Sequence, residues 1–585
     1  MPDYAAPIAD ISFALNEIAG LPDVAKLPGC DQAAPDLVAQ ILEEGGKFAG
    51  EVLAPLNAAG DRQGARFDNG EVRTSPGFAQ AFRAYVEAGW NALPFDPDYG
   101  GQGMPLLVAT AILEMWTSAN LAFSLCPMLT IGTVELLQTH GSPDQKRLYL
   151  AKLISGEWTG TMNLTEPQAG SDVGALRTRA VKEGDHYRIT GQKIFITYGE
   201  HDMAPNIVHM VLARLPDAPH GTKGISLFLV PKFLAQDDGG LGARNDLRCV
   251  SIEHKLGIHG SPTCVLSYGD EGGAIGYLVG EENRGMECMF TMMNNARLNV
   301  GLQGVAIAER AFQAALAYAR QRVQGQPVGV AGGGPWPIVH HPDVKRMLIE
   351  MKARIEAARA LAYTTAAAID GARHHGDAAE RVRQQKIADL LIPVVKAWCT
   401  DTGVEVASIG IQIHGGMGYI EETGVAQYLR DARIAPIYEG TNGIQANDLI
   451  GRKLARDGGA AARDFIAGMQ ALDGALAQRS GEDFAIIREH LAAGLHALAE
   501  ITPWLVAEYT RDTPRALAGA APYLKLFGCV TGGWLLAKGA LSGQSSPARL
   551  LTARFFAEHV LAPAPALLPA IRGGATIIAY EPGLS

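Results

Sequence analysis

The chain has 585 residues, 48% of them hydrophobic and 19% charged, so it is long enough for three or four packed units. A formal net charge of −11 and a pI near 5.8 argue against a broad phosphate-binding surface for nucleic acid. No run approaches the ~18 apolar residues of a membrane-spanning helix, and seven scattered cysteines without a CxxC pair or a zinc-type histidine partner fit reduced thiols, with no metal site expected.

The N-terminus lacks the basic start and the apolar core of a signal or transit peptide, so a cytoplasmic protein is expected. Residues 1–34 are predicted to form an N-terminal arm. Residues 35–156 carry apolar residues at helical spacing and predict an N-terminal α-helical domain. Within it, Ser142-Pro143-Asp144 has the residue types that begin a helix.

Residues 157–280 contain short alternating runs such as HYRITGQKIFIT and GISLFLVPK, which predict a β-domain, either a barrel or a sandwich. Residues 281–456 predict a bundle of long, largely buried helices. Residues 457–585 predict an additional C-terminal helical domain with amphipathic helices. The predicted fold class is therefore α+β and multidomain, in the order α, β, α, followed by further helices.

One carboxylate, Glu439, lies in an apolar stretch, RIAPIYEGTNGIQ at residues 433–445. Removing water from a carboxyl group raises its pKa toward the range of a general base, so Glu439 is the candidate catalytic residue. Gly440 can bring a backbone N–H against a ligand, and Thr441 offers a polar atom beside it. The alternative is that Glu439 caps a helix that begins near Ile444.

The β-domain opens with the loop MNLTEPQAGSD at residues 162–172, where Thr165 and Ser171 can donate hydroxyls and Gly170 lets the backbone approach a flat or phosphorylated ligand. Some 25 residues further on comes KIFITYG at residues 193–199. By itself a loop like 162–172 is usually an ordinary loop, and KIFITYG by itself would be an ordinary buried strand.

The segment around Glu439 closely resembles the catalytic-base segment of the acyl-CoA dehydrogenase family, and the loop 162–172 resembles the family's LTEPxAGSD motif nearly residue for residue. The resemblance implies an acyl-CoA dehydrogenase fold with FAD as cofactor. It places Met162, Leu164, Thr165, Gly170 and Ser171 along the flavin, with Ser171 also at the acyl-CoA.

KIFITYG is similar to the family's K-x-W-I-T-N-G, with Phe195 in place of the frequent Trp and Tyr198 in place of Asn. The match puts Phe195, Ile196 and Thr197 at the flavin, with the Thr197 hydroxyl near N5. KLGIHGS at residues 255–261 resembles the family's KLGIRGS turn, and His259 there has no assigned role.

In the second helical block, Asn294, where Asp is frequent, and Arg297 match residues that face acyl-CoA in the family. Arg322 matches the arginine that reaches the flavin pyrophosphate of a neighbouring subunit, or is an exposed cation at a helix end. QIHGGMG at residues 412–418 resembles QxxGGxG, which assigns Gln412, Gly415 and Gly416 to the ADP half of FAD across a subunit boundary. By the same resemblance Thr441 and Gly443 contact the cofactor, and Tyr438 and Gly440 contact the substrate.

The matches cover residues 35–455 in the family's order and imply the long subgroup with an extra C-terminal helical domain, of the 3-methylmercaptopropionyl-CoA dehydrogenase and bacterial fatty acyl-CoA dehydrogenase type. The expected reaction is α,β-dehydrogenation of a fatty acyl-CoA or 3-methylthiopropanoyl-CoA, with electrons passing to electron-transfer flavoprotein. An acyl-CoA oxidase and a DNA-damage-associated flavoprotein on the same scaffold are the alternatives. Residues 457–585 are expected to serve assembly, with a homodimer favoured over a tetramer.

Overall fold

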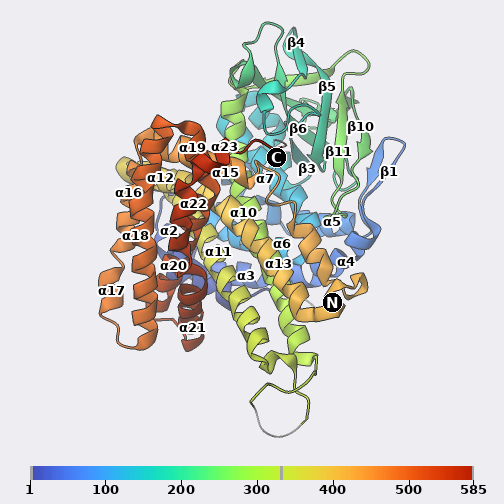
Figure 1. Ribbon diagram of the computed structural model, residues 1–585. Helices are drawn as coiled ribbons and strands as arrows, with labels where there is room; N and C mark the ends of the chain where they lie inside the picture. Colours follow the sequence, from blue (N-terminus) through green and yellow to red (C-terminus); the bar gives the residue numbers. More distant parts are fainter. Residues whose placement is uncertain (1–3, 330–333, 583–585) are drawn as a thin grey trace. The chain divides into compact units, whose positions relative to one another are not determined.

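A computed structural model describes residues 4–329 and 334–582 (Figure 1). The chain divides into two compact units, the first formed by residues 1–46, 105–118 and 297–585 and the second by residues 47–104 and 119–296. Three of the four divisions fall inside helices, in α3 (Pro35–Phe48), α6 (Leu106–Ala119) and α10 (Gly285–Gln321), and the fourth lies just before α6. Residues 1–3 of the predicted arm, 330–333 of the predicted helical bundle and 583–585 of the additional C-terminal domain lie outside the described residues.

The second unit contains an eight-stranded sheet. Its strands are β3 (Trp158–Asn163), β4 (Arg179–Glu183), β5 (His186–Thr197), β6 (Asn206–Arg214), β7 (Ile225–Pro231), β10 (Leu247–Ile252), β11 (Thr263–Tyr268) and β12 (Ala274–Val279). The order is β10-β11-β5-β12-β7-β6-β3, and β4 pairs with both β5 and β6, which closes β5, β12, β7, β6 and β4 into a ring. Only the β3–β6 and β4–β6 pairs are parallel in this sheet. The β-domain is therefore a barrel rather than a sandwich.

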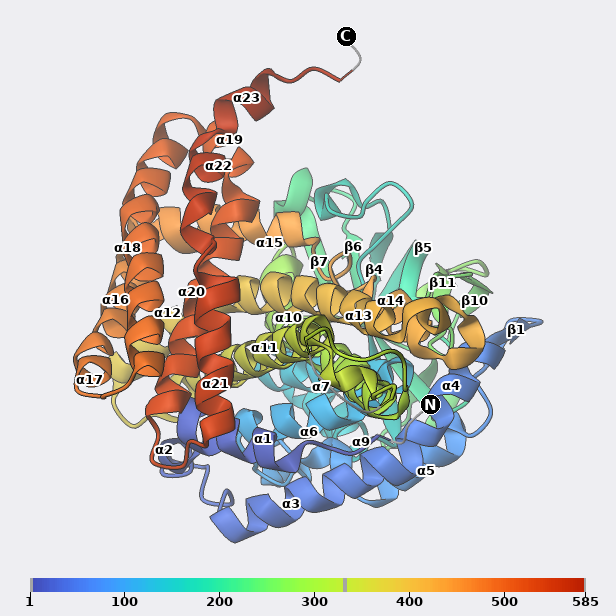
Figure 2. The same ribbon diagram turned by 60° about the horizontal axis from the view of Figure 1, so that its bottom comes forward.

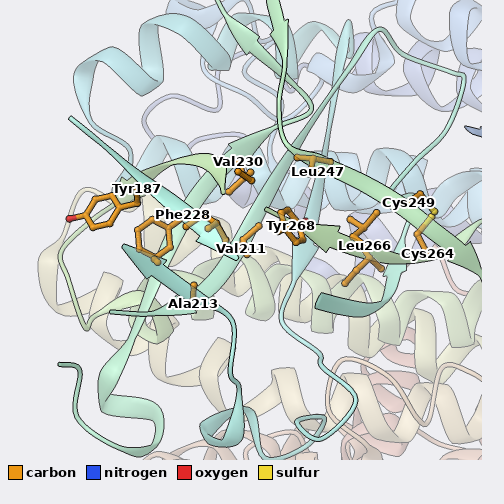
Figure 3. Close-up of a cluster of buried hydrophobic side chains, with 14 of the residues drawn as sticks. Tyr187, Val211, Ala213, Phe228, Val230, Leu247, Cys249, Cys264, Leu266 and Tyr268 are labelled. Atoms are coloured by element: carbon orange, nitrogen blue, oxygen red, sulfur yellow. The ribbon is translucent and has the colours of Figure 1, made fainter. Parts of the chain in front are cut away.

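The interior of this barrel is an apolar cluster contributed by alternate residues of several strands (Figure 3). Phe228 of β7 and Val211 of β6 are fully buried, and Tyr187 of β5 packs against Phe228 with ring centroids 4.9 Å apart. Because successive side chains of a strand point to opposite faces, the residues between these are free to face loops or ligands.

The helices of the second unit include one that is long and apolar enough to cross a membrane, α7 (Leu121–His140). Its apolar window is 94% buried inside the protein, so α7 is a core helix. The expectation that no stretch approaches the length and apolar character of a membrane-spanning helix was therefore wrong for α7. The other elements are η2 (Ala49–Leu53), α4 (Ala54–Gln63), α5 (Phe78–Glu87), α8 (Pro143–Gln145), η5 (Lys146–Leu150), α9 (Ala151–Ser155) and two small hairpins, β1 (Arg66–Asp68) with β2 (Glu71–Arg73) and β8 (Phe233–Ala235) with β9 (Leu241–Arg244). The predicted helix start at Ser142 is confirmed, because its hydroxyl and the Gln145 side chain form a capping box on α8. The β1–β2 hairpin was not predicted.

The first unit is helical. It begins with an arm of short helices, α1 (Ile8–Phe13), η1 (Ala14–Ala19) and α2 (Leu21–Val24), and continues with α11 (Pro342–His374), α12 (Ala378–Val394), η9 (Val395–Cys399), α13 (Thr400–His414), η10 (Gly415–Tyr419), α14 (Val425–Ala432), α15 (Asn442–Asp448) and η12 (Leu449–Leu454). η9 is a π-helical turn, a wide turn that often occurs at functional sites. It lies between α12 and α13 without a break in the helical backbone.

The last helices are α16 (Ala460–Gln470), α17 (Asp473–Ala477), α18 (Glu482–Arg511), α19 (Thr513–Ala518), α20 (Ala520–Leu541), α21 (Pro547–Phe556), α22 (Leu568–Arg572) and α23 (Gly574–Ala579). Figure 2 shows α16, α18, α20 and α21 side by side, and the same elements contact one another. α20 also packs on α11 and α15, so the helix is buried against its own chain. The predicted class, helical and β-barrel domains followed by helical domains, is confirmed.

Candidate active site

The loop that carries Glu439 follows α14 and leads into α15. Glu439 has a φ of 56°, a left-handed conformation that is uncommon for a residue with a side chain and that occurs at functional sites. The helix cap is Thr441, whose Oγ1 accepts a hydrogen bond of 3.2 Å from the Ile444 backbone N–H. The alternative in which Glu439 caps this helix is therefore wrong.

The side chain of Glu439 is half-buried. Burial raises the pKa of its carboxyl to about 7, against the opposing charges of Arg297 and Lys396. Within residues 4–329 and 334–582 the carboxylate accepts no hydrogen bond, and the Glu439 backbone N–H donates none. A carboxylate with a pKa near neutrality and uncommitted oxygens can accept a proton from a ligand.

Two residues assigned to the substrate stand beside Glu439 in the same unit. Arg297 is buried on α10, and its Nη1 lies 3.2 Å from Asp448 Oδ2 of α15. Tyr438 is half-buried, donates its hydroxyl to Gln303 Oε1, and has a pKa raised by burial and by the Glu439 charge. The Gln445 side chain donates to the Glu439 carbonyl at 3.1 Å and so fixes the loop from the other side.

Sequence reasoning missed Lys396, which lies in the π-helical turn η9 and has no exposed surface. Its Nζ donates a hydrogen bond of 2.8 Å to Asn442 Oδ1, three residues after Glu439. Burial lowers the pKa of Lys396 to about 7, while Glu439 and Asp401 act to raise it. A lysine inside the otherwise apolar run LLIPVVKAWC was the signal that could have identified it.

In the second unit, the loop 162–172 is organised by a buried carboxylate, Glu166. Glu166 Oε1 accepts hydrogen bonds from Lys193 Nζ at 2.8 Å and from the Thr178 hydroxyl at 2.6 Å, while the Arg177 N–H donates to Oε2 at 2.6 Å. Lys193 Nζ also donates to the Leu164 carbonyl at 3.0 Å. The loop is therefore held from below by an ion pair.

The side chains assigned to FAD on this loop remain accessible. Met162, Leu164 and Thr165 are half-buried, and Gly170 and Ser171 are exposed. No atom lies within 4 Å of a Cβ built on Gly170. In the part of the chain that the structure describes, the Thr165 and Ser171 hydroxyls take part in no hydrogen bond, so they are available to a ligand.

The last residues of β5 and the residue that follows it differ in how far their side chains are exposed. Phe195 is 57% exposed and has a φ of 60°, which is strained for an aromatic residue. Thr197 is half-buried, whereas the Ile196 side chain belongs to the barrel core, so only the backbone of Ile196 can reach a cofactor. Tyr198, in place of the family's Asn, donates its hydroxyl to the Ala122 carbonyl at 2.7 Å.

Two other predicted positions lie in the second unit. Asn294 is half-buried on α10. His259 has its Nδ1 2.9 Å from Asp61 Oδ1 and its Nε2 2.8 Å from the Lys255 carbonyl oxygen, which makes it part of the loop structure.

The residues assigned to the ADP half of FAD are on the surface of the first unit. Arg322 and Gln412 are exposed, and Gly415 and Gly416 have no atom within 4 Å of a built Cβ. Gly415 has a φ of 59°, a conformation open to glycine. Beside them, Met417 is 51% exposed and Tyr419 is 86% exposed, so the turn offers apolar surface next to open backbone.

The predicted residues thus form two groups. The first unit holds Glu439, Tyr438, Gly440, Thr441, Gly443, Arg297, Arg322, Gln412, Gly415 and Gly416, and the second holds Met162, Leu164, Thr165, Gly170, Ser171, Phe195, Ile196, Thr197 and Asn294. Among the described residues, no group of three or more His, Cys, Asp and Glu side chains that could hold a metal is found. The free hydroxyls, the exposed aromatic Phe195 and the open glycines are the donor set and surfaces that suit a flavin dinucleotide.

Four domain families match the chain in succession. They are "Acyl-CoA dehydrogenase, N-terminal domain" at residues 38–157, "Acyl-CoA dehydrogenase, middle domain" at 161–270, "Acyl-CoA dehydrogenase, C-terminal domain" at 283–454 and "Acetyl-CoA dehydrogenase C-terminal like" at 460–580.

Individual relatives match nearly the whole chain. The sequence is 49% identical over 569 residues to 3-methylmercaptopropionyl-CoA dehydrogenase of Ruegeria pomeroyi, covering 95% of this chain and 96% of that protein. It is 35% identical over 557 residues to a broad-specificity linear acyl-CoA dehydrogenase of Mycobacterium tuberculosis, covering 92% and 90%. The structure of an acyl-CoA dehydrogenase complexed with FAD from Bacillus anthracis has the same fold, with a TM-score of 0.74 at 21% identity over 98% of this chain and 92% of that one.

Proposed function

The chain belongs to the acyl-CoA dehydrogenase family, whose members are FAD oxidoreductases that act on CH–CH bonds, and we propose that it converts an acyl-CoA thioester to the trans-2-enoyl-CoA with Glu439 as the base. The observation that carries the proposal is the Glu439 carboxyl, which has uncommitted oxygens and a pKa raised by burial to about 7. Such a group is ionised often enough at neutral pH to accept a proton, and basic enough to do so effectively.

Glu439 acts on the α-carbon of the thioester. An α-proton is a weak acid, so the thioester carbonyl has to be polarised before the proton leaves. The Glu439 backbone N–H is uncommitted within the described residues and lies on a strained residue, which suits it to donate to that carbonyl. Carboxylate and N–H of a single residue then flank the reacting carbon, and Gln445 and Asn442 hold that residue in place.

The cofactor is FAD, which accepts the β-hydrogen as a hydride when it is bound. The hydroxyls of Thr165, Ser171 and Thr197 are proposed to hydrogen-bond the isoalloxazine side, and Phe195 to pack against the ring. Arg322, Gln412 and the open Gly415–Gly416 backbone are proposed to bind the ADP half in a second copy of the chain.

The proposed substrate is 3-methylthiopropanoyl-CoA or a linear fatty acyl-CoA. The first is supported by the 49% identity with the Ruegeria pomeroyi enzyme, and the second by the broad-specificity relative. A sulfur atom and a methylene group are nearly isosteric, so the pocket can be tested only by comparing both classes. Flavin bleaching by C4 to C18 acyl-CoAs and by 3-methylthiopropanoyl-CoA decides between them.

The proposed partners are electron-transfer flavoprotein as the electron acceptor and a second copy of the chain. The exposed Met417 and Tyr419 beside the Gly415–Gly416 turn support a homodimer, because a partner subunit would cover this apolar surface. Among the helices after residue 457, the apolar helix α20 is buried against its own chain and not left for a partner. This burial weakens the idea that these helices serve assembly. A cytoplasmic location is part of the proposal and is supported by seven free, buried cysteines.

The deciding experiment replaces Glu439 by Gln and measures anaerobic flavin reduction by saturating butanoyl-CoA and 3-methylthiopropanoyl-CoA. The amide preserves the shape and removes the base, so FAD content and acyl-CoA binding are expected to survive while reduction slows by at least ~10⁴-fold, the upper end of the general-base range. Glu421→Gln, at an exposed glutamate of the same unit, is the matched control and is expected to behave as wild type. Reduction within about tenfold of wild type in Glu439→Gln would show that another residue is the base.

A further inference from the structure

The structure joins the Glu439 loop to the turn η9 through one side chain, Asn442. Its Oδ1 accepts from Lys396 Nζ at 2.8 Å and from the Thr400 hydroxyl at 3.3 Å. Its Nδ2 donates to the Ala397 carbonyl at 3.1 Å and to Asp401 Oδ1 at 2.7 Å. The amide of Asn442 is thus satisfied entirely by η9 and by the start of α13.

This arrangement fixes the chain close to Glu439 on both sides. The Asn442 N–H bonds the Pro436 carbonyl at 3.0 Å, which closes the loop around Glu439. Because Asn442 also bonds Lys396, the position of the ammonium and the position of the loop are set together. An ammonium has three N–H donors, and among the described residues Asn442 Oδ1 is the acceptor for one of them.

The π-helical turn η9, which carries Lys396, packs against the additional C-terminal helices. Trp398 packs so closely on α20 that a Cβ at Gly528 would lie 2.4 Å from Trp398 Cγ, and one at Gly532 would lie 3.1 Å from Trp398 Cη2. The Trp398 ring also meets Phe556 of α21 edge-on, with centroids 6.5 Å apart. The C-terminal domain therefore buttresses η9 directly.

The charged groups around this point come from the Glu439 loop and from six helical elements, α10, η9, α13, α15, η12 and α20. Glu439 faces Arg297 of α10 and Lys396 of η9. Lys396 faces Glu439, Asp401 of α13 and Arg297. Asp401 faces Glu405 of its own helix and Lys525 of α20, and Arg297 faces Asp448 and Arg452. Arg297 pairs with Asp448, whereas Lys396 has a neutral amide as its acceptor. Both positive charges favour the ionised form of Glu439, that of Arg297 more strongly.

We propose that Lys396 is a positioning residue for the Glu439 base: its buried side chain, held by Asn442, favours the ionised carboxylate when it is protonated and fixes the loop that carries Glu439. The inference rests on the proposed function. It also gives the C-terminal domain a role in catalysis, since α20 holds the turn on which Lys396 lies.

The test is the pH dependence of kcat/KM, which reports the ionisation of groups in the free enzyme. The wild type is expected to gain activity as pH rises through about 7, where Glu439 ionises. Removing a facing positive charge raises the carboxyl pKa, by about 1 unit or more for charges within ~4–6 Å. Lys396 is itself only partly protonated near pH 7, so the acid side of the pH profile (the acid limb) of a neutral variant should move upward by up to about 1 unit. The loss should reach up to about fivefold at pH 7 and almost disappear at pH 9.

Two variants of Lys396 separate the effect of its positive charge from the effect of its hydrogen bond to Asn442. Lys396→Gln removes the charge and keeps an N–H donor for Asn442, whereas Lys396→Met removes both. Both are expected to move the acid limb upward by a similar amount, and Lys396→Met should also lower the plateau rate. Lys396→Arg keeps the charge and should leave the limb within about 0.5 unit of wild type. Lys538→Met is the control and should not move the acid limb. Lys538 is a half-buried lysine of the first unit whose Nζ donates to the Ile18 carbonyl at 2.7 Å.

Probes are butanoyl-CoA and 3-methylthiopropanoyl-CoA with the FAD-loaded enzyme and an artificial electron acceptor. An acid limb within about 0.3 unit of wild type in both Lys396→Gln and Lys396→Met would overturn the proposal, even if the rate fell uniformly at every pH. If Lys396→Met does not fold, the Lys396→Gln limb alone decides. Loss of turnover in Glu439→Gln with an unmoved limb in the Lys396 variants would reject the role of Lys396 alone, whereas retained turnover in Glu439→Gln would reject the base itself.

Discussion

The buried ion pair between Glu166 and Lys193, which holds the loop 162–172, provides a sharp test of how this β-barrel is stabilised. Burial would raise the pKa of Glu166, but Lys193 and the hydrogen bonds from Thr178 and Arg177 outweigh burial and lower the pKa from 4.5 to about 2. The shift corresponds to about 3 kcal/mol of stabilisation at neutral pH. This contribution is fully present above pH 4.5 and is lost as pH falls toward 2.

Burying the partner, Lys193, costs a similar free energy. Burial lowers the pKa of Lys193 from 10.5 to about 8 in spite of Glu166, which costs about 3 kcal/mol at neutral pH. The two contributions nearly cancel, so the pair adds little net stability, as buried ion pairs often do. Removing one partner is different, because the other charge then stays buried without its counter-ion.

Glu166→Gln is therefore expected to destabilise the barrel by about 3–5 kcal/mol. The double variant Glu166→Gln/Lys193→Met should recover more than half of that loss, because it removes the stranded ammonium. Glu183→Gln is the control. Its carboxylate pairs with Arg188 at 2.8 Å with a side chain 57% exposed, and because solvent screens such a surface pair, its loss should change stability little.

Because the chain has two compact units, local stability is the quantity to measure. Hydrogen exchange of peptides that span β3, β5 and the loop 162–172 gives the free energy of opening of this region. FAD affinity is a second readout, since Lys193 holds the Leu164 carbonyl. A loss below about 1 kcal/mol in Glu166→Gln, or a double variant no more stable than the single one, would refute the reasoning.

Two further predictions follow from buried groups elsewhere. His201 and His209 are buried in the second unit, and burial lowers the pKa of each to about 3. An unfolded histidine binds a proton near pH 6.5, so the stability of the second unit should fall as pH drops from 6.5 toward 3, by about 2 kcal/mol per histidine at pH 5. Unchanged hydrogen exchange of β3 and β6 between pH 7.5 and 5 would contradict this prediction. Gly528→Ala places a Cβ 2.4 Å from Trp398 Cγ, so overpacking should cost about 1–3 kcal/mol and lower activity through η9, whereas Gly468→Ala, where a Cβ meets no atom within 4 Å, should be neutral in thermal unfolding and in kcat.

Much of the molecule is encoded in short stretches of sequence. Helical and alternating apolar spacing predicted the order of helical and β-domains, because both periodicities follow from local backbone geometry. Ser142 and Gln145 predicted their own helix start, since a capping box needs residues only three apart. Glu439 was predicted as a candidate base in the same way, because its apolar neighbours are adjacent in the chain.

Other features depend on residues far apart in the sequence. Tertiary contacts between strands and helices decide three of these features: the closure of the ring by β4, the burial of α7 and the burial of the Ile196 side chain in the barrel core. The same holds for Lys396, whose acceptor Asn442 is 46 residues away, and for α20, which reaches η9 from the C-terminal helices. Local spacing determined that Glu439 could be a base, whereas only tertiary packing determined which charges surround it, because electrostatic interaction and burial depend on distance in space and not along the chain.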